Sequence, residues 1–207
     1  MLDEQRTSGL VTARDLEIAQ WLERLVGASV DQLRRRFAMG QSQAYRRLEV
    51  LEQHGLIDRR PILFGRPVLF TVRPRELGPS TYEHAAAVAS LVAELESGGA
   101  KVVTDVELRG ARGKQRLFGP LDGIALQTFL ACRRTPDVIE CLADGAVGAY
   151  EVELSSKGRA RRESILTHYA LSDYEFVRWI VPDPSIRALL SAEIAEMGLT
   201  RLMEVIG

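Results

Sequence analysis

Three carboxylates in the second half of the chain have the types and spacing that could hold a divalent cation. Glu151 and Glu153 stand two residues apart. Residues i and i+2 of a strand point to the same face, so these two are expected side by side. A turn at residues 143–146 would fold the preceding strand back and bring Asp137 towards them. Such oxygen ligands suit Mg²⁺ or Mn²⁺, which could activate water and stabilise a phosphodiester transition state.

A second set of side chains has the chemistry of DNA recognition. In the segment 41–54, Ala44, Leu48 and Leu51 repeat at helical spacing, which leaves polar and basic side chains for the outer face and the N-terminal end. Gln and Arg read base edges, and Ser, Tyr and Arg also hold phosphates. The DNA-contacting residues expected from this pattern are Gln41, Ser42, Gln43, Tyr45, Arg46 and Arg47, together with Arg66 from the hairpin that follows.

The element that must position these side chains is a helix-turn-helix. Val30, Leu33 and Phe37 place one apolar face on a short helix, with Ser29 as its expected N-cap. Gly40 interrupts the pattern, and two helices joined by a short turn with Gly are typical of a helix-turn-helix. Gly55 is expected to end the second helix in the left-handed conformation.

A hairpin is predicted directly after the second helix. Segments 57–63 and 68–72 flank Phe64-Gly65-Arg66-Pro67, and Gly and Pro mark the turn. A basic hairpin tip at this place is the wing of a winged helix, which can reach a minor groove or a phosphate, while the second helix enters the major groove. A winged helix used for protein contact, or a basic face that is only solvated, stays open as the alternative.

Composition and charge bound the possible functions. The chain has 207 residues, a net charge of −1 and 46% hydrophobic residues, which is enough to bury a core. Residues 29–75 carry ten Arg and four acidic residues, and residues 76–207 carry 14 Lys or Arg and 19 acidic residues. A basic front and an acidic back fit a DNA-reading domain joined to something else. The two cysteines, Cys132 and Cys141, are expected to be reduced, and neither a signal peptide nor a membrane span is expected.

The coarse reading along the chain is α+β with two domains. A winged helix-turn-helix over 12–74 begins with a helix capped by Thr12 and Asp15, and a Pro- and Gly-rich boundary at 73–80 follows. A mixed α/β domain over 81–207 comes next. Its basic loop 109–120 could be solvated or contact DNA, and 121–132 is ambiguous between helix and strand. The expected helices are 82–96, 159–171 and 185–197, and the expected strands are 101–108, 138–142, 147–154, 175–181 and 199–206.

At Pro136-Asp137 and Glu151-Val152-Glu153 the chain resembles the PD-(D/E)xK nuclease superfamily. The resemblance implies a restriction-endonuclease-like α/β domain in which Asp137, Glu151 and Glu153 are metal ligands and catalytic residues. The family's motif has a lysine two residues after the second acid, and this chain has Glu153 there. Lys157 could reach in from the loop as the missing cation.

The whole layout also resembles the replication-relaxation family of bacterial plasmids and integrative elements. Gly65-Arg66-Pro67, Pro136-Asp137 and Glu151-Val152-Glu153 carry this resemblance, over roughly residues 12–182. It implies a winged helix followed by a degenerate nuclease-like domain, and a DNA-binding accessory in replication, transfer or transcription of a mobile element.

These observations predict a sequence-specific double-stranded DNA-binding protein that acts in replication, transfer or transcriptional control of a bacterial mobile element. It is expected to be a cytoplasmic, nucleoid-associated homodimer that needs no cofactor to bind DNA and could contact a replication or transfer protein. The first alternative is a metal-dependent DNA endonuclease, targeted by the winged helix and using Mg²⁺ or Mn²⁺. The second alternative is an adaptor whose acidic α/β domain recruits another protein.

Overall fold

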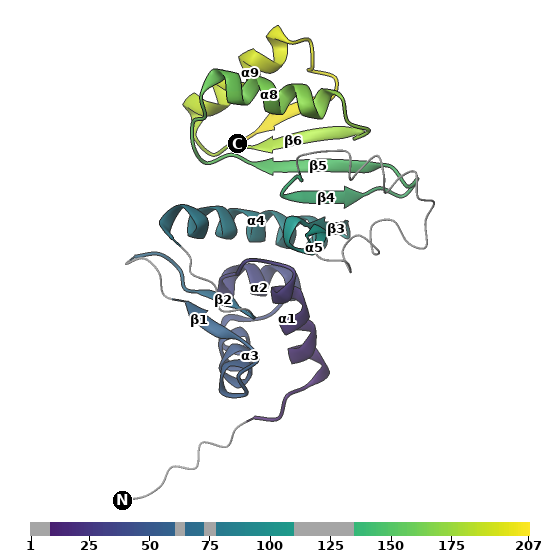
Figure 1. The fold of residues 1–207 in the computed structure, drawn as a ribbon. Coiled ribbons are helices and arrows are strands. Elements are labelled where there is room, and N and C mark those ends of the chain that lie inside the picture. Colours follow the sequence, from purple (N-terminus) through teal and green to yellow (C-terminus); the bar gives the residue numbers. More distant parts are fainter. Residues whose placement is uncertain (1–8, 61–64, 73–77, 110–134) are drawn as a thin grey trace, which may run out of the picture. The chain divides into compact units, whose positions relative to one another are not determined.

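The computed structural model describes residues 9–60, 65–72, 78–109 and 135–207. The chain divides into two compact units, Met1–Ser97 and Gly98–Gly207. The described residues form seven helices and two sheets, so the mixed α+β class expected from the sequence is confirmed (Figure 1). None of the described helices is both long and apolar enough to cross a membrane. The basic segment 110–120, the ambiguous segment 121–132 and Cys132 lie outside the described residues.

The N-terminal unit begins with three short helices, α1 (Ala13–Glu23), α2 (Val30–Phe37) and α3 (Gln41–Gln53). The predicted capping box of α1 is present, because the Thr12 hydroxyl accepts from Asp15 N and an Asp15 oxygen accepts from Thr12 N at 2.7 Å. These reciprocal bonds satisfy N–H groups that the first turn leaves without helical partners.

The pattern breaks at Gly40 as predicted, since Gly40 is extended and serves as the N-cap of α3. The left-handed residue of the turn between α2 and α3 is Ala38, with φ 49°. The predicted left-handed Gly55 after α3 is confirmed at φ 66°. The helix pair is therefore built as expected, although its turn uses a non-glycine residue in the strained conformation.

A small sheet follows the helices. Strands β1 (Asp58–Arg60) and β2 (Leu69–Thr71) pair antiparallel, as predicted for the hairpin. Residues 61–64 lie outside the described part of this hairpin. Ala28 adds a bridge to Phe70, with N–O distances of 3.0 and 2.8 Å in the two directions. The bridge joins the hairpin to the segment between α1 and α2, so the helices and the hairpin form one body.

Helix α4 (Pro79–Ser97) belongs to the N-terminal unit, whereas the sequence analysis placed it in the second domain. Gln32 of α2 donates to Ala86 O at 2.7 Å and to Ser90 Oγ at 2.8 Å. At the far end of α4, Glu96 accepts from Trp21 Nε1 at 2.9 Å. The division between the two units therefore falls after Ser97 and not at the expected Pro- and Gly-rich segment, because α4 packs into the core of the N-terminal unit.

The second unit is built on a five-stranded sheet with the order β3-β4-β5-β6-β7. Strands β3, β4 and β5 are antiparallel to one another, and β5, β6 and β7 are parallel. The predicted turn between β4 and β5 is confirmed, with Gly145 at φ 89°. The strands are β3 (Lys101–Thr104), β4 (Val138–Cys141), β5 (Val147–Val152), β6 (Phe176–Ile180) and β7 (Met203–Ile206).

Helices α8 (Arg159–Ala170) and α9 (Pro184–Glu196) pack on one face of this sheet (Figure 1). The apolar core of this unit includes Leu166, Val177 and Trp179. One local prediction was wrong. Residues 105–108 form the helical turn α5 (Asp105–Leu108) and do not extend strand β3, since Thr104 and Glu107 cap a helix there. Helix α9 has Asp183 as its N-cap, whose side chain accepts from the main chain of Ser185 and Ile186.

Candidate functional site

The outer surface of α3 presents most of the side chains that the sequence assigned to DNA. Its apolar face, formed by Ala44, Leu48 and Leu51, is buried as predicted. The predicted contact residues that are exposed to solvent are Gln41, Ser42, Gln43, Tyr45 and Arg46. Tyr45 is 47% exposed, which is unusual for a large aromatic side chain. The N-terminal two turns of α3 are therefore available to a partner.

Arg47, unlike the other predicted contact residues of α3, is largely buried in an ion pair. Its side chain is 18% exposed, and its Nη1 lies 3.0 Å from Oδ2 of Asp15, whose side chain is fully buried. The same carboxylate oxygen accepts from the Thr12 main chain and hydroxyl, both at 2.7 Å. Arg47 therefore ties α3 to the start of α1, a partner that helical spacing alone did not reveal.

Arg66, in the connection between β1 and β2, is exposed but paired. Its Nη2 lies 2.9 Å from Oε1 of Glu83 on α4, and both side chains remain well exposed. Gly65 before it has φ 76°, and the carbonyl of Pro67 after it accepts from the Tyr82 hydroxyl. This connection is thus bound to α4, and Arg66 must exchange Glu83 for a phosphate if it is to contact DNA.

The C-terminal half of α3 carries acids that the sequence analysis did not assign. A shallow open groove between α3 and β1 is lined by Tyr45, Glu49, Glu52, Gln53 and Arg59. Glu52 is paired with Arg59 at 3.3 Å, and the Arg59 guanidinium lies 5.6 Å from the ring centre of Phe70. Glu49 is exposed, with Gln53 Nε2 at 3.5 Å from its Oε1.

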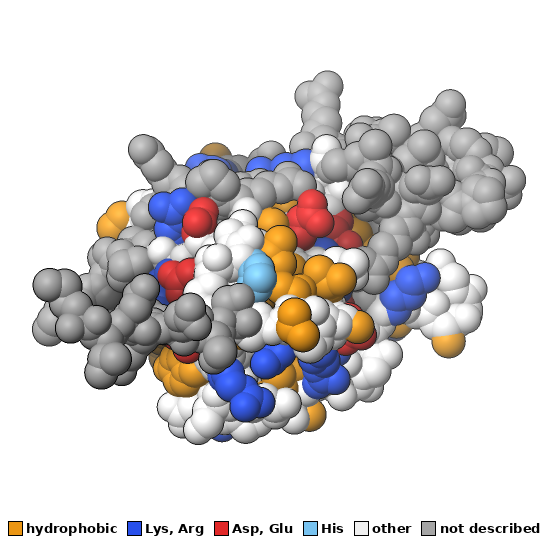
Figure 2. All heavy atoms as spheres, turned by 90° about the horizontal axis from the view of Figure 1, so that it is seen from below, with side chains coloured by type: hydrophobic (Ala, Val, Ile, Leu, Met, Phe, Trp, Pro, Cys, Tyr) orange, Lys and Arg blue, Asp and Glu red, His pale blue; other side chains and the backbone are white. Residues whose placement is uncertain are grey.

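The charge of the folded N-terminal unit differs from that of the segment 29–75. Residues 1–97 contain 13 Arg and 13 acidic residues, because the unit includes the acids of α1 and α4. In the view of Figure 2, basic side chains are interspersed with acidic and apolar ones among the described residues. The positive charge of segment 29–75 is therefore balanced by acidic residues elsewhere in the N-terminal unit. Any electrostatic attraction to DNA has to come from individual basic side chains on its surface.

The acids of the second unit lie where β4 begins and β5 ends. Asp137 Oδ2 accepts from Val152 N at 2.8 Å, and the Asp137 carbonyl accepts from Asp105 N at 2.9 Å. Glu151 is 4% exposed and accepts from the Tyr169 hydroxyl of α8. Two of the three predicted metal ligands thus bond to groups within the protein. Asp137 links the start of β4 to the end of β5, and Glu151 links β5 to α8.

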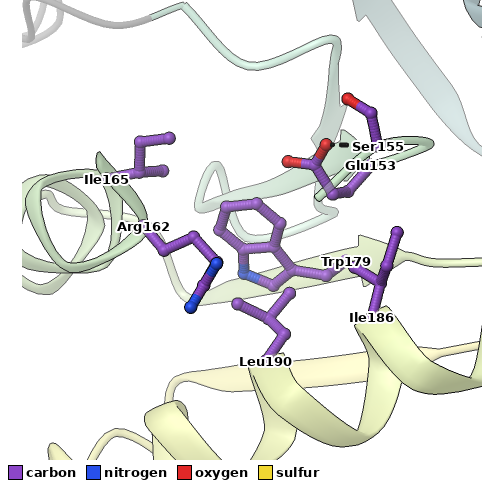
Figure 3. A pocket seen from close by; sticks show the side chains of 7 residues that line it. All are labelled: Glu153, Ser155, Arg162, Ile165, Trp179, Ile186 and Leu190. Atoms are coloured by element: carbon purple, nitrogen blue, oxygen red, sulfur yellow. Dashed lines mark hydrogen bonds between the residues drawn. The ribbon is translucent and has the colours of Figure 1, made fainter. Parts of the chain in front are cut away.

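Glu153 is the third acid, and Lys157 is paired with it. The Lys157 ammonium forms an ion pair with Glu153 Oε2, and Ser155 N donates to Glu153 Oε1 at 3.3 Å. Glu153 also lines a small pocket, where Figure 3 shows the Trp179 indole between the Glu153 carboxylate and the Arg162 guanidinium. With apolar walls from α8 and α9, this pocket is too small for a nucleotide.

The cationic residues that begin α8 face other acids. Arg162 forms two bonds to Glu193 of α9, at 2.6 and 2.7 Å. The hydrogen bond from Arg162 lowers the pKa of Glu193 below its usual range, even though burial raises it. Arg159 is paired with Glu163 at 2.7 Å and Glu196 at 3.1 Å. Arg159 and Arg162 thus link α8 to α9.

No group of three or more His, Cys, Asp or Glu side chains suited to a metal ion occurs in the described ranges, which contain Asp137, Glu151 and Glu153. The arrangement at the strand ends can hold β4, β5 and α8 together through charged hydrogen bonds. No family model matches the chain, and no curated protein matches it either. The two family resemblances therefore rest on the motifs alone.

Proposed function

We propose that this chain binds double-stranded DNA in a sequence-dependent way through the N-terminal half of α3. The proposal rests on one observation. Gln41, Gln43 and Arg46 are all exposed on α3, the second helix of the helix pair. Arg46 is exposed and forms no ion pair with any residue that the structure describes. Gln and Arg pair with adenine and guanine in the major groove through two hydrogen bonds each.

The charge distribution bears on how much of the proposed binding would come from phosphate contacts and how much from base contacts. A unit with no net charge gains little from general attraction to phosphates, so base contacts must supply a large share of the discrimination. Ser42 and Tyr45, which lie beside Arg46, can bond to phosphate without adding charge. We infer a binder with a shallow dependence on salt.

The biological setting follows from the resemblance to the replication-relaxation family. We propose a homodimer that acts in replication, transfer or transcriptional control of a bacterial mobile element, with the second unit serving assembly or contact with a replication protein. In this proposal the acids Asp137, Glu151 and Glu153 stabilise the second unit. The nuclease alternative has less support, because Glu151 and Glu153 are bonded to Tyr169 and Lys157.

A selection from a random duplex pool tests the proposal, followed by mobility shifts on the selected sequence. Arg46→Ala should weaken binding about tenfold or more, since a lost bidentate pair is worth about 1–3 kcal/mol. Arg35→Ala is the matched control, because Arg35 is an exposed arginine on α2, 3.8 Å from Glu94. No enriched sequence, or equal effects of the two substitutions, would rule out reading by α3.

A further inference from the structure

We infer that Glu49 is a specificity-determining residue, which selects cytosine by accepting a hydrogen bond from its exocyclic amino group. The inference rests on the proposed function, since it concerns the same helix. It starts from an acid that simple attraction to DNA does not explain. Glu49 is exposed on the outer surface of α3, three residues after Arg46.

Helical spacing places Glu49 next to the proposed reading residues. Residues three apart on a helix are neighbours on its surface, so Arg46 and Glu49 can face adjacent base pairs in one groove. A helix that presents Arg46 to a base edge therefore also brings Glu49 near the groove floor or the phosphates. Next to phosphate, the carboxylate would be repelled.

The neighbouring acid is neutralised, and Glu49 is not. Glu52 is paired with Arg59, an arginine that lies over the Phe70 ring. Glu49 forms no ion pair with any described residue, and its carboxylate accepts one weak hydrogen bond within the described part of the chain, from Gln53 Nε2 at 3.5 Å. A neutral amide orients the carboxylate and leaves its charge in place, so an acceptor remains for a donor brought by the DNA.

The chemistry of the major groove limits what that donor can be. A carboxylate offers acceptors only, and the exposed donors of the groove are the amino groups of cytosine and adenine. Adenine presents an acceptor, N7, beside its amino group, which repels a carboxylate; cytosine presents the amino group without one. Cytosine therefore fits Glu49 best, one base step from the base that Arg46 reads.

The full-length chain, Glu49→Ala and Glu49→Gln should each be used to select duplexes from the same random pool. The unmodified chain should prefer cytosine at one position by about tenfold, and Glu49→Ala should lose that preference while the rest of the motif persists. Glu49→Gln should change the preference to adenine, because the Gln amide pairs with its amino group and N7. Glu17→Ala, at an exposed acid of α1, removes the same charge and should leave the motif unchanged.

The possible outcomes distinguish a failure of the inference about Glu49 from a failure of the proposed DNA binding. If the unmodified chain enriches a motif and Glu49→Ala enriches the same motif at every position, then Glu49 does not select a base. If the unmodified chain enriches nothing, the proposed sequence-dependent binding fails, and the role of Glu49 fails with it. An equal change in Glu17→Ala would show that only overall charge matters, which also overturns the inference.

Discussion

The guanidinium of Arg47 lies 3.0 Å from the carboxylate of Asp15, and the Asp15 side chain has no exposed surface. The second carboxylate oxygen, Oδ1, is buried with no hydrogen-bond partner among the described residues. A buried charge that loses its counter-ion is expensive, so this pair matters more to the fold than a surface ion pair would. It also sets Arg47 apart from Arg46, which precedes it directly and is exposed.

Substituting these two neighbouring arginines should separate stability from DNA binding. Arg47→Ala should lower the free energy of unfolding by about 3 kcal/mol, because it leaves Asp15 buried without its cation. Arg46→Ala should change it by less than about 0.5 kcal/mol, as exposed substitutions usually do. Urea unfolding followed by circular dichroism measures both. Equal stability of the two variants would contradict the structural role of Arg47.

If the chain binds DNA as proposed, freeing Arg66 from Glu83 should strengthen that binding. Arg66 is held 2.9 Å from Glu83, so a phosphate has to compete with that carboxylate. Glu83→Gln should raise the affinity for duplex DNA a few-fold and steepen the log–log salt dependence by up to about 0.9, the amount expected for one added phosphate contact. Mobility shifts at several salt concentrations measure this. The double variant Glu83→Gln/Arg66→Ala should show no gain, and a gain there would exclude Arg66 as its source.

Glu96 should make the stability of the N-terminal unit depend on pH. Burial raises the pKa of Glu96, but Arg24 at 2.6 Å and the hydrogen bond from Arg36 outweigh it, and the net pKa lies below the usual 4.5. A carboxyl whose pKa is lowered by folding stabilises the fold above its unfolded pKa, and this contribution is lost as the pH falls through the folded pKa.

Glu96→Gln should therefore lower the free energy of unfolding at pH 7 by about 2 kcal/mol, since charged hydrogen bonds are lost. The difference from the unmodified chain should shrink as the pH falls below about 4.5. Urea titrations at several pH values measure it. Glu94→Gln, an exposed acid on the same helix, is the control. A difference that stayed constant down to low pH would show that the charge of Glu96 is not responsible.

Lys157 and Glu153 should be coupled. Both side chains are largely buried, so removing either leaves the other as an unpaired charge. Lys157→Met and Glu153→Gln should each cost about 2 kcal/mol, and the double variant should cost clearly less than the two together. A double-mutant cycle on urea unfolding measures the coupling. Strict additivity would mean that the ion pair has no energetic weight.

Divalent cations should have little effect on the second unit. The acids expected to hold a metal are engaged by the Val152 main chain, the Tyr169 hydroxyl and Lys157. Millimolar Mg²⁺ or Mn²⁺ should leave the thermal midpoint unchanged and supercoiled plasmid intact. Cutting that is present in the unmodified chain and absent in Asp137→Ala would instead establish the nuclease alternative.

Local signals carried the successful predictions. The capping box at Thr12, the apolar repeat of α3 and the glycine at position 55 act within a few residues, and each was confirmed. The β4–β5 hairpin also follows from its turn residues, with Gly145 at φ 89°. Such features depend on the chain close to them, so they can be predicted without knowing the tertiary structure.

The sequence analysis missed contacts whose partners are distant in sequence. The pattern of α4 indicates an apolar face but not the surface it covers, and the Pro- and Gly-rich segment before it was taken for a domain boundary. Arg66 pairs with Glu83, 17 positions away, and Arg47 with Asp15, 32 positions away, so both were assigned to DNA alone. Helical spacing identifies which side chains share a face, and tertiary contacts decide which of them remain available.

The place of α4 has a practical consequence for anyone who shortens this protein. A fragment that stops at residue 74 would lose Tyr82 and Ala85, which cover Leu69, and Glu96, which joins Trp21 and Arg24. Such a fragment would keep the whole helix pair and still expose part of its apolar interior. A fragment that stops at Ser97, just before the Gly98-Gly99 pair, would retain every one of these contacts and is the smallest piece to express alone.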